Sequence, residues 1–174
     1  MGAYSIVKFG NKALREKSKV VEDVNDDIRK LAEDMLATMR EADGIGLAAE
    51  QIGRNEAICI IDVPKEHACD IKMPLVLINL KVIEKDGELH EQEGCLSFPD
   101  VYIKVHRSKE VTATYTDLEG KQQTVKATGL LSRAIQHELD HLNGVLLVDH
   151  MSPVQKVANA GKLKRMKRAA KPIF

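Results

Sequence analysis

The stretch Gln136-His137-Glu138-Leu139-Asp140-His141 places a metal-binding helix at the centre of the expected fold. Residues four apart on a helix share a face, so the imidazoles of His137 and His141 stack on one side, with Glu138 between them in the sequence. Neutral imidazole nitrogens bind divalent metal ions, and a carboxylate that is not itself a ligand can take a proton from metal-bound water. The stretch therefore predicts half of a metal site, with hydrolysis as its chemistry.

Three segments are expected to form helices. The central one spans residues 129–143, which carry apolar residues at helical spacing and end at Gly144. Asn25 caps an N-terminal helix that runs through residue 43, and Pro153 opens a last, basic helix that reaches about Ala169. The central helix is expected to be largely buried, because it is the most apolar of the three.

The segments before the central helix favour strands. Residues 57–63 and 75–84 are apolar and β-branched and flank a polar loop at 64–74, while residues 111–115 and 125–127 alternate on either side of a turn at 118–121. The glycine-rich residues 44–53 are expected to form a shaped loop and a short strand. The expected fold class is α+β, with antiparallel sheets packed around the central metal-binding helix and with an N-terminal helix and a basic C-terminal helix.

Length and composition favour one catalytic domain over residues 1–174. The chain has 44% hydrophobic residues, three scattered cysteines and no apolar run of membrane-spanning length, which favours a reducing compartment without membrane contact. A monomer is expected, although nothing in the composition decides this. Its formal net charge is zero, but the part after Asp149 has seven basic residues and no acidic one. Residues 153–174 are therefore expected to be a basic helical extension of the catalytic body.

The third metal ligand must come from outside the central helix, because catalytic sites of this type use three protein ligands. Downstream, Leu147 stands where one peptidase pattern needs a third histidine, and no glutamate follows Glu138. Upstream, Cys95 lies beside Gly94, and a thiolate is a strong, soft donor. An isolated cysteine is also often a small buried hydrophobe, so spacing alone leaves this choice open.

Three segments in order resemble the peptide deformylase family. The family patterns are Gly-x-Gly-x-Ala-Ala-x-Gln, Glu-Gly-Cys-x-Ser and Gln-His-Glu-x-Asp-His, and they match residues 44–51, 93–97 and 136–141. The similarity extends over nearly the whole chain. Glu50 is a departure, since the family usually has proline there; it bears on the loop that aims Gln51 and touches no expected ligand.

This resemblance implies an enzyme that removes the formyl group from the N-terminal methionine of newly made proteins and releases formate. It implies Cys95, His137 and His141 as ligands and Fe(II) as the native metal, which zinc, nickel or cobalt can replace. Glu138 would act as general acid and base. The side-chain amide of Gln51 and the backbone N–H of Leu96 are the groups expected to bind the charged formyl oxygen.

The expected substrate-binding residues form an apolar pocket for the methionine side chain and its surroundings. They are Ile45, Gly46, Gly94, Leu130, Arg133 and Ala134. Glu93 is expected to support the site rather than bind metal, with Arg107 as a hypothetical partner. Asp140 could orient a neighbouring group through hydrogen bonds, but a carboxylate on the helix surface is the more ordinary interpretation. His150 is left unassigned.

The resemblance also bears on partners and location. Formyl-methionyl nascent peptides are the implied substrates, and residues 162–171 would dock on the ribosome, although a merely solvated basic helix face fits the sequence as well. The bacterial cytosol is the expected location.

Two further hypotheses stay open beside the deformylase. One is a general metallopeptidase built on the same histidines, which would cleave internal bonds of unformylated peptides. The other is a non-catalytic ribosome- or RNA-binding protein with a structural metal, for which a fourth protein ligand would be expected.

Overall fold

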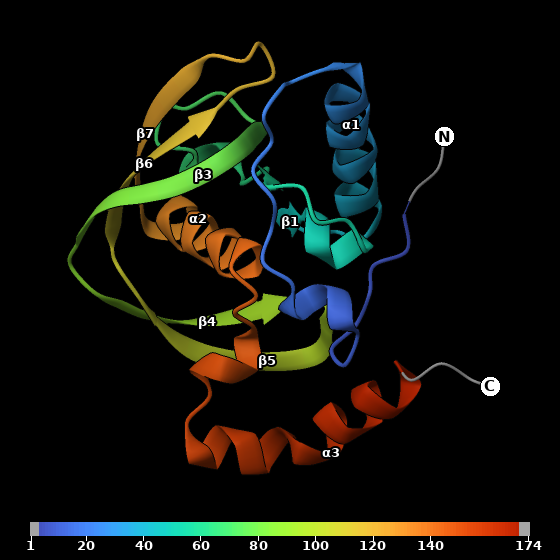
Figure 1. Ribbon diagram of the computed structural model, residues 1–174. Helices are drawn as coiled ribbons and strands as arrows, with labels where there is room; N and C mark the ends of the chain where they lie inside the picture. Colours follow the sequence, from blue (N-terminus) through green and yellow to red (C-terminus); the bar gives the residue numbers. More distant parts are fainter. Residues whose placement is uncertain (1–3, 171–174) are drawn as a thin grey trace.

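The computed structural model describes residues 4–170 and places helix α2 (Gly129–Leu142) between two antiparallel sheets (Figure 1). The larger sheet has five strands in the order β1-β2-β3-β6-β7. Their bounds are β1 (Gly46–Ala48), β2 (Ile58–Ile61), β3 (Leu75–Asp86), β6 (Glu110–Thr116) and β7 (Gln122–Thr128). The smaller sheet pairs β4 (Leu89–Cys95) with β5 (Phe98–Arg107). The α+β class predicted from the sequence is confirmed.

Strand β2 shows how the larger sheet is buried on both faces. Cys59 and Ile61 lie in the hydrophobic cluster that includes α2, whereas Ile58 and Ile60 lie in the cluster that includes α1 (Asp26–Glu41). All four side chains are fully buried. Alternate side chains of a strand point to opposite faces, so this apolar run separates the two helices.

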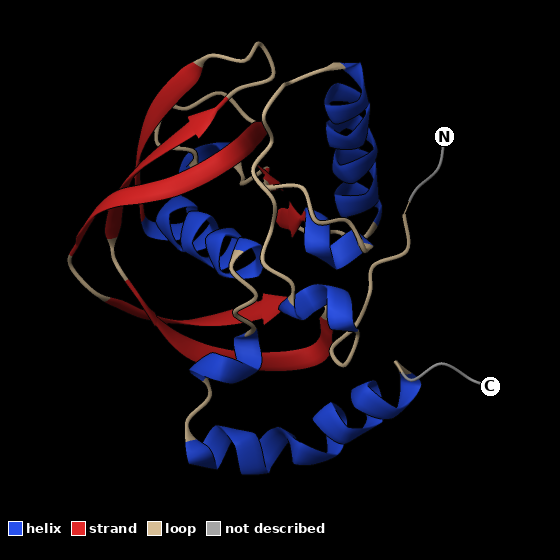
Figure 2. Ribbon diagram, viewed as in Figure 1, coloured by secondary structure: helices blue, strands red, loops and turns tan. Residues whose placement is uncertain are grey.

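A further α-helix lies at the C-terminal end of the described residues, and four short 3-10 helices are spread along the chain (Figure 2). Helix α3 (Pro153–Ala169) is capped by Ser152 and packs below β5. The short 3-10 helices are η1 (Lys12–Arg15), η2 (Ala49–Ile52), η3 (Lys65–His67) and η4 (Leu147–His150). Among residues 4–170 no helix combines the length and the apolar character needed to cross a membrane.

The structure differs from the sequence expectations at several points. Helix α1 ends at Glu41, β2 is shorter than residues 57–63, and β3 continues to Asp86. Strands β4 and β5 were not predicted. Strand β4 is mostly exposed and polar, whereas β5 alternates buried and exposed residues and could have been identified. In the last helix the sequence has apolar residues at Val154, Val157 and Leu163, which were expected to face the body, but Val154 and Val157 are each 78% exposed. The third expected apolar position, Leu163, is partly buried and packs against the body together with Met166.

Candidate metal centre and active site

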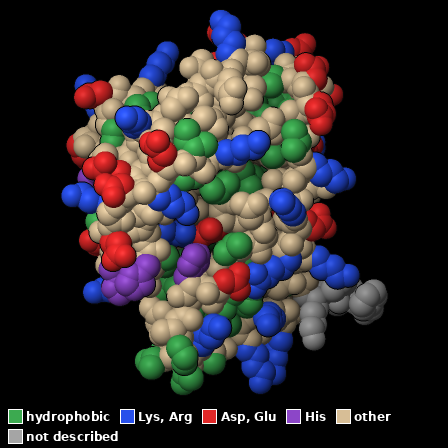
Figure 3. Space-filling model, turned by 60° about the vertical axis from the view of Figure 1, so that its left-hand side comes forward, with side chains coloured by type: hydrophobic (Ala, Val, Ile, Leu, Met, Phe, Trp, Pro, Cys, Tyr) green, Lys and Arg blue, Asp and Glu red, His purple; other side chains and the backbone are tan. Residues whose placement is uncertain are grey.

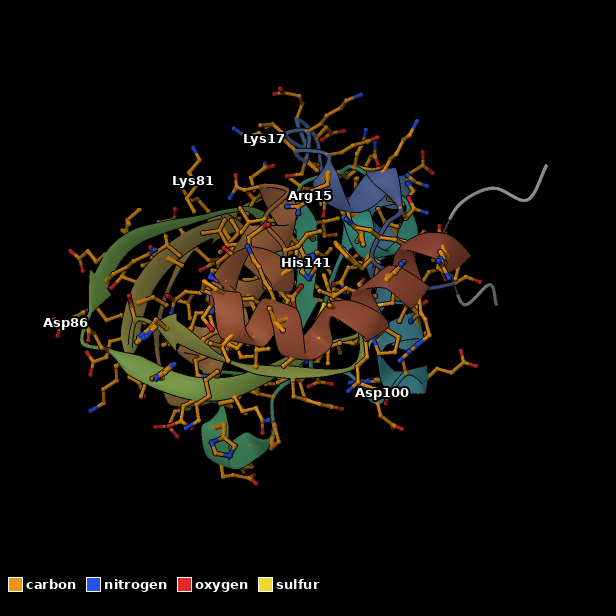
Figure 4. The ribbon with its side chains drawn as sticks, turned by 90° about the horizontal axis from the view of Figure 1, so that it is seen from below. Arg15, Lys17, Lys81, Asp86, Asp100 and His141 are labelled. Atoms are coloured by element: carbon orange, nitrogen blue, oxygen red, sulfur yellow. The ribbon has the colours of Figure 1, made fainter. Side chains whose placement is uncertain are left out.

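Three potential metal ligands meet where α2 passes the end of β4. His137 and His141 lie one turn apart on α2 with ring centroids 5.0 Å apart, and Cys95 Sγ lies 3.3 Å from His141 Nε2. One ligand atom from each of these three residues lies within 4.8 Å of the other two. His141 is in the interior of the molecule (Figure 4). A thiolate and two imidazoles at this separation fit one divalent metal ion and leave a coordination position for water.

The local electrostatics prepare the cysteine for this role. Burial raises the pKa of the Cys95 thiol, but the neighbouring rings of His141 and His137 outweigh burial and lower the pKa to about 5. Cys95 is therefore a thiolate at neutral pH. The thiolate is the form that binds a metal ion.

Glu138 lies next to this cluster and is 3% exposed. Burial raises the pKa of its carboxyl group to about 7, although His137 and His141 act to lower it. Its Oε2 atom has no hydrogen-bond partner among the described residues. A Cβ atom on Gly46 would come within 2.2 Å of Glu138 Oε1, so only glycine leaves room for the carboxyl group here. A carboxyl group with a pKa near neutrality is suited to both accepting and donating a proton.

Gln51 in η2 points its side chain at the same cluster. Its Nε2 donates to Ser97 Oγ at 3.2 Å and lies 3.6 Å from Cys95 Sγ, while its Oε1 accepts from the Ala48 N–H at 2.9 Å. Gln51 is 1% exposed. The amide group is therefore held in one orientation, with its NH₂ group toward the cysteine ligand.

A buried ion-pair network supports His137. Glu93 Oε2 lies 3.2 Å from His137 Nδ1, and Arg107 donates to both oxygens of Glu93 at 3.0 Å. Arg107 also donates to Asp140 Oδ2 at 2.6 Å, and His150 Nε2 lies 2.7 Å from the same oxygen. Burial raises the pKa of Glu93, but its bonds to His137 and Arg107 lower the pKa to about 2. Glu93 is thus an ionised group that orients the imidazole.

This network confirms one sequence hypothesis, corrects another and gives a partner to a residue that was unassigned. The pairing of Glu93 with Arg107 is confirmed. The interpretation of Asp140 as a surface carboxylate is wrong, because Asp140 binds both Arg107 and His150. His150 was unassigned because its partner becomes apparent only once η4 folds back against α2.

A cavity of about 440 Å³ opens in front of the metal ligands. All six residues expected to bind substrate line it, namely Ile45, Gly46, Gly94, Leu130, Arg133 and Ala134. Leu96 and Gln51 also line it. Tyr102 of β5 lies in the wall and was missed. The alternation of Val101, Ile103 and Val105 could have identified this strand and placed Tyr102 on its opposite face.

The fold and the site together define a metal-dependent hydrolase whose central helix carries two histidine ligands and a carboxylate. A family model described as "Polypeptide deformylase" matches residues 3–157. The chain therefore belongs to the peptide deformylase family. Members of this family remove the formyl group from the N-terminal formyl-methionine of newly synthesised polypeptides, and this chain is an enzyme of that activity. Its substrates are formylated nascent peptides.

Individual relatives agree with this assignment. The chain is 49% identical over 148 residues to "Peptide deformylase 2" of Gloeobacter violaceus, covering 84% of this chain and 78% of the relative. It is 48% identical to the peptide deformylase of Rhizobium meliloti, covering 91% and 88% of the two chains. The crystal structure of a peptide deformylase from Legionella pneumophila superposes with a TM-score of 0.87 at 37% identity, covering 98% and 100% of the chains.

Proposed function

We propose that Cys95, His137 and His141 hold one Fe(II) ion and that zinc, nickel or cobalt can replace it. The meeting of a thiolate with two imidazoles beside Glu138 is the observation that carries this proposal. Such a mixed sulfur and nitrogen site binds several first-row metals, with affinity that rises from iron to nickel. The metal found in a preparation therefore reflects availability as well as affinity.

The residues around the ligands have complementary roles in the proposed reaction. When bound, the metal ion supplies a Lewis acid and a water molecule of lowered pKa. Glu138 takes a proton from the attacking water and later gives a proton to the leaving amine. Gln51 and the backbone N–H of Leu96 donate hydrogen bonds to the formyl oxygen as negative charge develops on it.

The cavity provides the specificity in this proposal. Leu130 and Ala134 project from α2 beside His137 and supply an apolar wall for the methionine side chain. The stem of Arg133 borders the same space, while its Nη2 donates to Gln92 O at 2.6 Å. Ile45, Gly46 and Gly94 line the approach, where the substrate backbone would lie.

Formate release from a formyl-methionyl peptide tests these roles. We expect Glu138→Ala to abolish formate release while metal content stays near one ion per chain, because Glu138 moves protons and does not bind the metal. Glu33→Ala is a matched control, since Glu33 is exposed on α1. Formate release that survives Glu138→Ala would remove Glu138 from the mechanism. Cleavage of internal bonds in an unformylated peptide would favour a general metallopeptidase.

We propose that α3 docks the enzyme on the ribosome through its basic residues. Basic and apolar side chains lie at the lower end of the molecule, where α3 is located (Figure 3). Lys164, Arg165 and Arg168 are exposed and suit rRNA phosphates.

Two other basic residues of α3 contact the catalytic body. Lys162 donates to Asp100 O at 2.6 Å, and Lys167 Nζ lies 5.2 Å from the centroid of the Phe9 ring. Lys171 belongs to the same basic run but lies outside the described residues.

This docking proposal is tested by replacing charges rather than by truncation, because Lys162 and Lys167 also contact the catalytic body. We expect alanine at Lys164, Arg165 and Arg168 to weaken co-sedimentation with ribosomes at low salt. The matched control is alanine at three exposed lysines elsewhere, which are Lys12, Lys17 and Lys72. Unchanged co-sedimentation of the first variant would refute the proposed ribosome contact.

We further propose that the chain acts as a monomer in the bacterial cytosol, as one catalytic domain with a helical extension at residues 153–174. Residues 171–174 of this extension lie outside the described part. The three cysteines of the catalytic body, Cys59, Cys69 and Cys95, are all unpaired, which supports a reducing compartment. Analytical ultracentrifugation tests the oligomeric state: a mass near 19.3 kDa is expected for the monomer, and twice that mass would contradict it.

A further inference from the structure

The turn between β4 and β5 contains Leu96 and Ser97, directly after the ligand Cys95. The carbonyl groups of a two-residue turn do not take part in the strand ladder, so they need partners elsewhere or water. Here both have protein partners. Lys8 Nζ donates to Leu96 O at 2.8 Å, and the Phe9 N–H donates to Ser97 O at 3.0 Å. The N-terminal segment therefore holds the turn that carries one proposed oxyanion donor.

The same segment also reaches the second proposed donor. The Val7 N–H donates to Gln51 O at 2.8 Å. In Figure 1 the blue N-terminal part of the chain lies between η2 and β5, and η1 packs against η2. Three consecutive residues, 7 to 9, thus bind the backbone carbonyls of both segments that carry the proposed oxyanion donors.

Lys8 is the member of this segment whose contact is made by a charged side chain. Burial lowers the pKa of Lys8, whereas the negative charge of Cys95 raises it. The ammonium group donates to the carbonyl of Leu96, the residue that directly follows Cys95. A charge-assisted hydrogen bond is also stronger than one between neutral groups. Lys8 is an exposed residue, so its charged hydrogen bond restrains the Leu96 carbonyl only modestly, but more firmly than a neutral donor at the same place could.

We propose that Lys8 is a positioning residue for deformylation, which holds the Leu96 carbonyl so that the Leu96 N–H stays aimed at the formyl oxygen. This inference rests on the oxyanion roles proposed above for Gln51 and Leu96. A preorganised donor stabilises charge that develops in the transition state more than it stabilises the bound substrate. The effect of Lys8 therefore belongs to kcat rather than to KM.

Lys8→Met tests the inference, because it removes the ammonium group and keeps an unbranched side chain. Lys8→Arg retains a charged donor, and Lys12→Met is a matched control at an exposed lysine on η1. For Lys8→Met we expect kcat to fall about fivefold with KM within about twofold, well short of the roughly 100- to 1000-fold loss on removing a donor outright. Hydrogen exchange of the Leu96 amide in the metal-loaded protein should become faster. Lys8→Arg should restore both readouts, and Lys12→Met should change neither.

Three results would each overturn the inference. The first is that Lys8→Met keeps the wild-type kcat and the wild-type exchange rate of the Leu96 amide. The others are that Lys8→Met changes only KM, or that Lys12→Met loses as much kcat as Lys8→Met. A Gln51→Ala variant separates this failure from failure of the proposed function. If Gln51→Ala loses about 100-fold in kcat while Lys8→Met is unchanged, only the role of Lys8 is wrong. If Gln51→Ala keeps wild-type kcat, the oxyanion role of Gln51 is wrong, and the inference built on it falls as well.

Discussion

Replacing Arg107 by methionine would break the ion-pair network behind His137. Arg107 and Glu93 have side chains only 5% and 6% exposed, and they are joined by two hydrogen bonds of 3.0 Å. Without the guanidinium group, Glu93 would remain a buried carboxylate with His137 Nδ1 at 3.2 Å and Arg133 Nε at 3.7 Å. Removing one partner of a buried ion pair costs about 3–5 kcal/mol. For a chain of this size, that corresponds to a fall in Tm of about 6–20 °C.

The same substitution should weaken metal binding. Glu93 orients His137 through Nδ1, and loss of such supporting contacts typically costs about 10- to 100-fold in metal affinity. Calorimetry of the metal-free protein gives the change in Tm, and competition with a chelator gives the change in affinity.

A double variant separates these two effects. Arg107→Met combined with Glu93→Gln should recover much of the stability, because no unpaired charge stays buried. It should not recover the metal affinity, because a neutral amide replaces the carboxylate beside His137. The smallest effects that the reasoning allows in Arg107→Met are a fall in Tm of about 6 °C and a loss of about 10-fold in metal affinity. A Tm within about 2 °C of wild type together with unchanged metal affinity would refute it.

Three other substitutions have outcomes that the structure specifies. Gly46→Ala should lower kcat by at least about 100-fold with little loss of fold, because its Cβ would displace the Glu138 carboxyl group; an unchanged kcat would contradict this. Burial raises the pKa of Glu50 from 4.5 to about 8, so the folded state keeps a proton that the unfolded chain releases. The free energy of unfolding should therefore decrease as the pH rises from about 4.5 to 8, by up to roughly 5 kcal/mol. In urea unfolding measured across this pH range, Glu50→Gln should not show this decrease in stability. Curves of stability against pH that run parallel in wild type and Glu50→Gln would contradict the expectation. Ala134→Phe should fill the cavity and raise KM for formyl-methionyl peptides several-fold; an unchanged KM would place the methionine side chain elsewhere.

Much of the architecture follows from local sequence patterns. The helix at residues 129–143 was predicted to within one residue of α2, and the last helix has the predicted bounds of residues 153–169. Both segments carry strong end signals, which are Gly144 after the first and Pro153 at the start of the second. Periodicity and caps act within a few residues, so a single sequence reveals them.

Strand β4 and the charge network depend on contacts across the chain. The sequence of β4 is polar because most of its residues face solvent, so it lacks the alternation that identifies a half-buried strand. Asp140 contacts Arg107, which is 33 residues away, and His150, which is 10 residues away. Such pairs are set by how β5 and η4 pack against α2. The sequence offered the residue types but not their pairing.

The central claim is that Cys95 and the two histidines of α2 bind one metal ion that keeps a position for water. X-ray absorption of the zinc-loaded protein tests it most directly, since sulfur and nitrogen ligands differ in distance. The account predicts one sulfur at about 2.3 Å, two imidazole nitrogens at about 2.0–2.1 Å and one oxygen ligand. A shell without sulfur, or one filled by a fourth protein ligand, would contradict it.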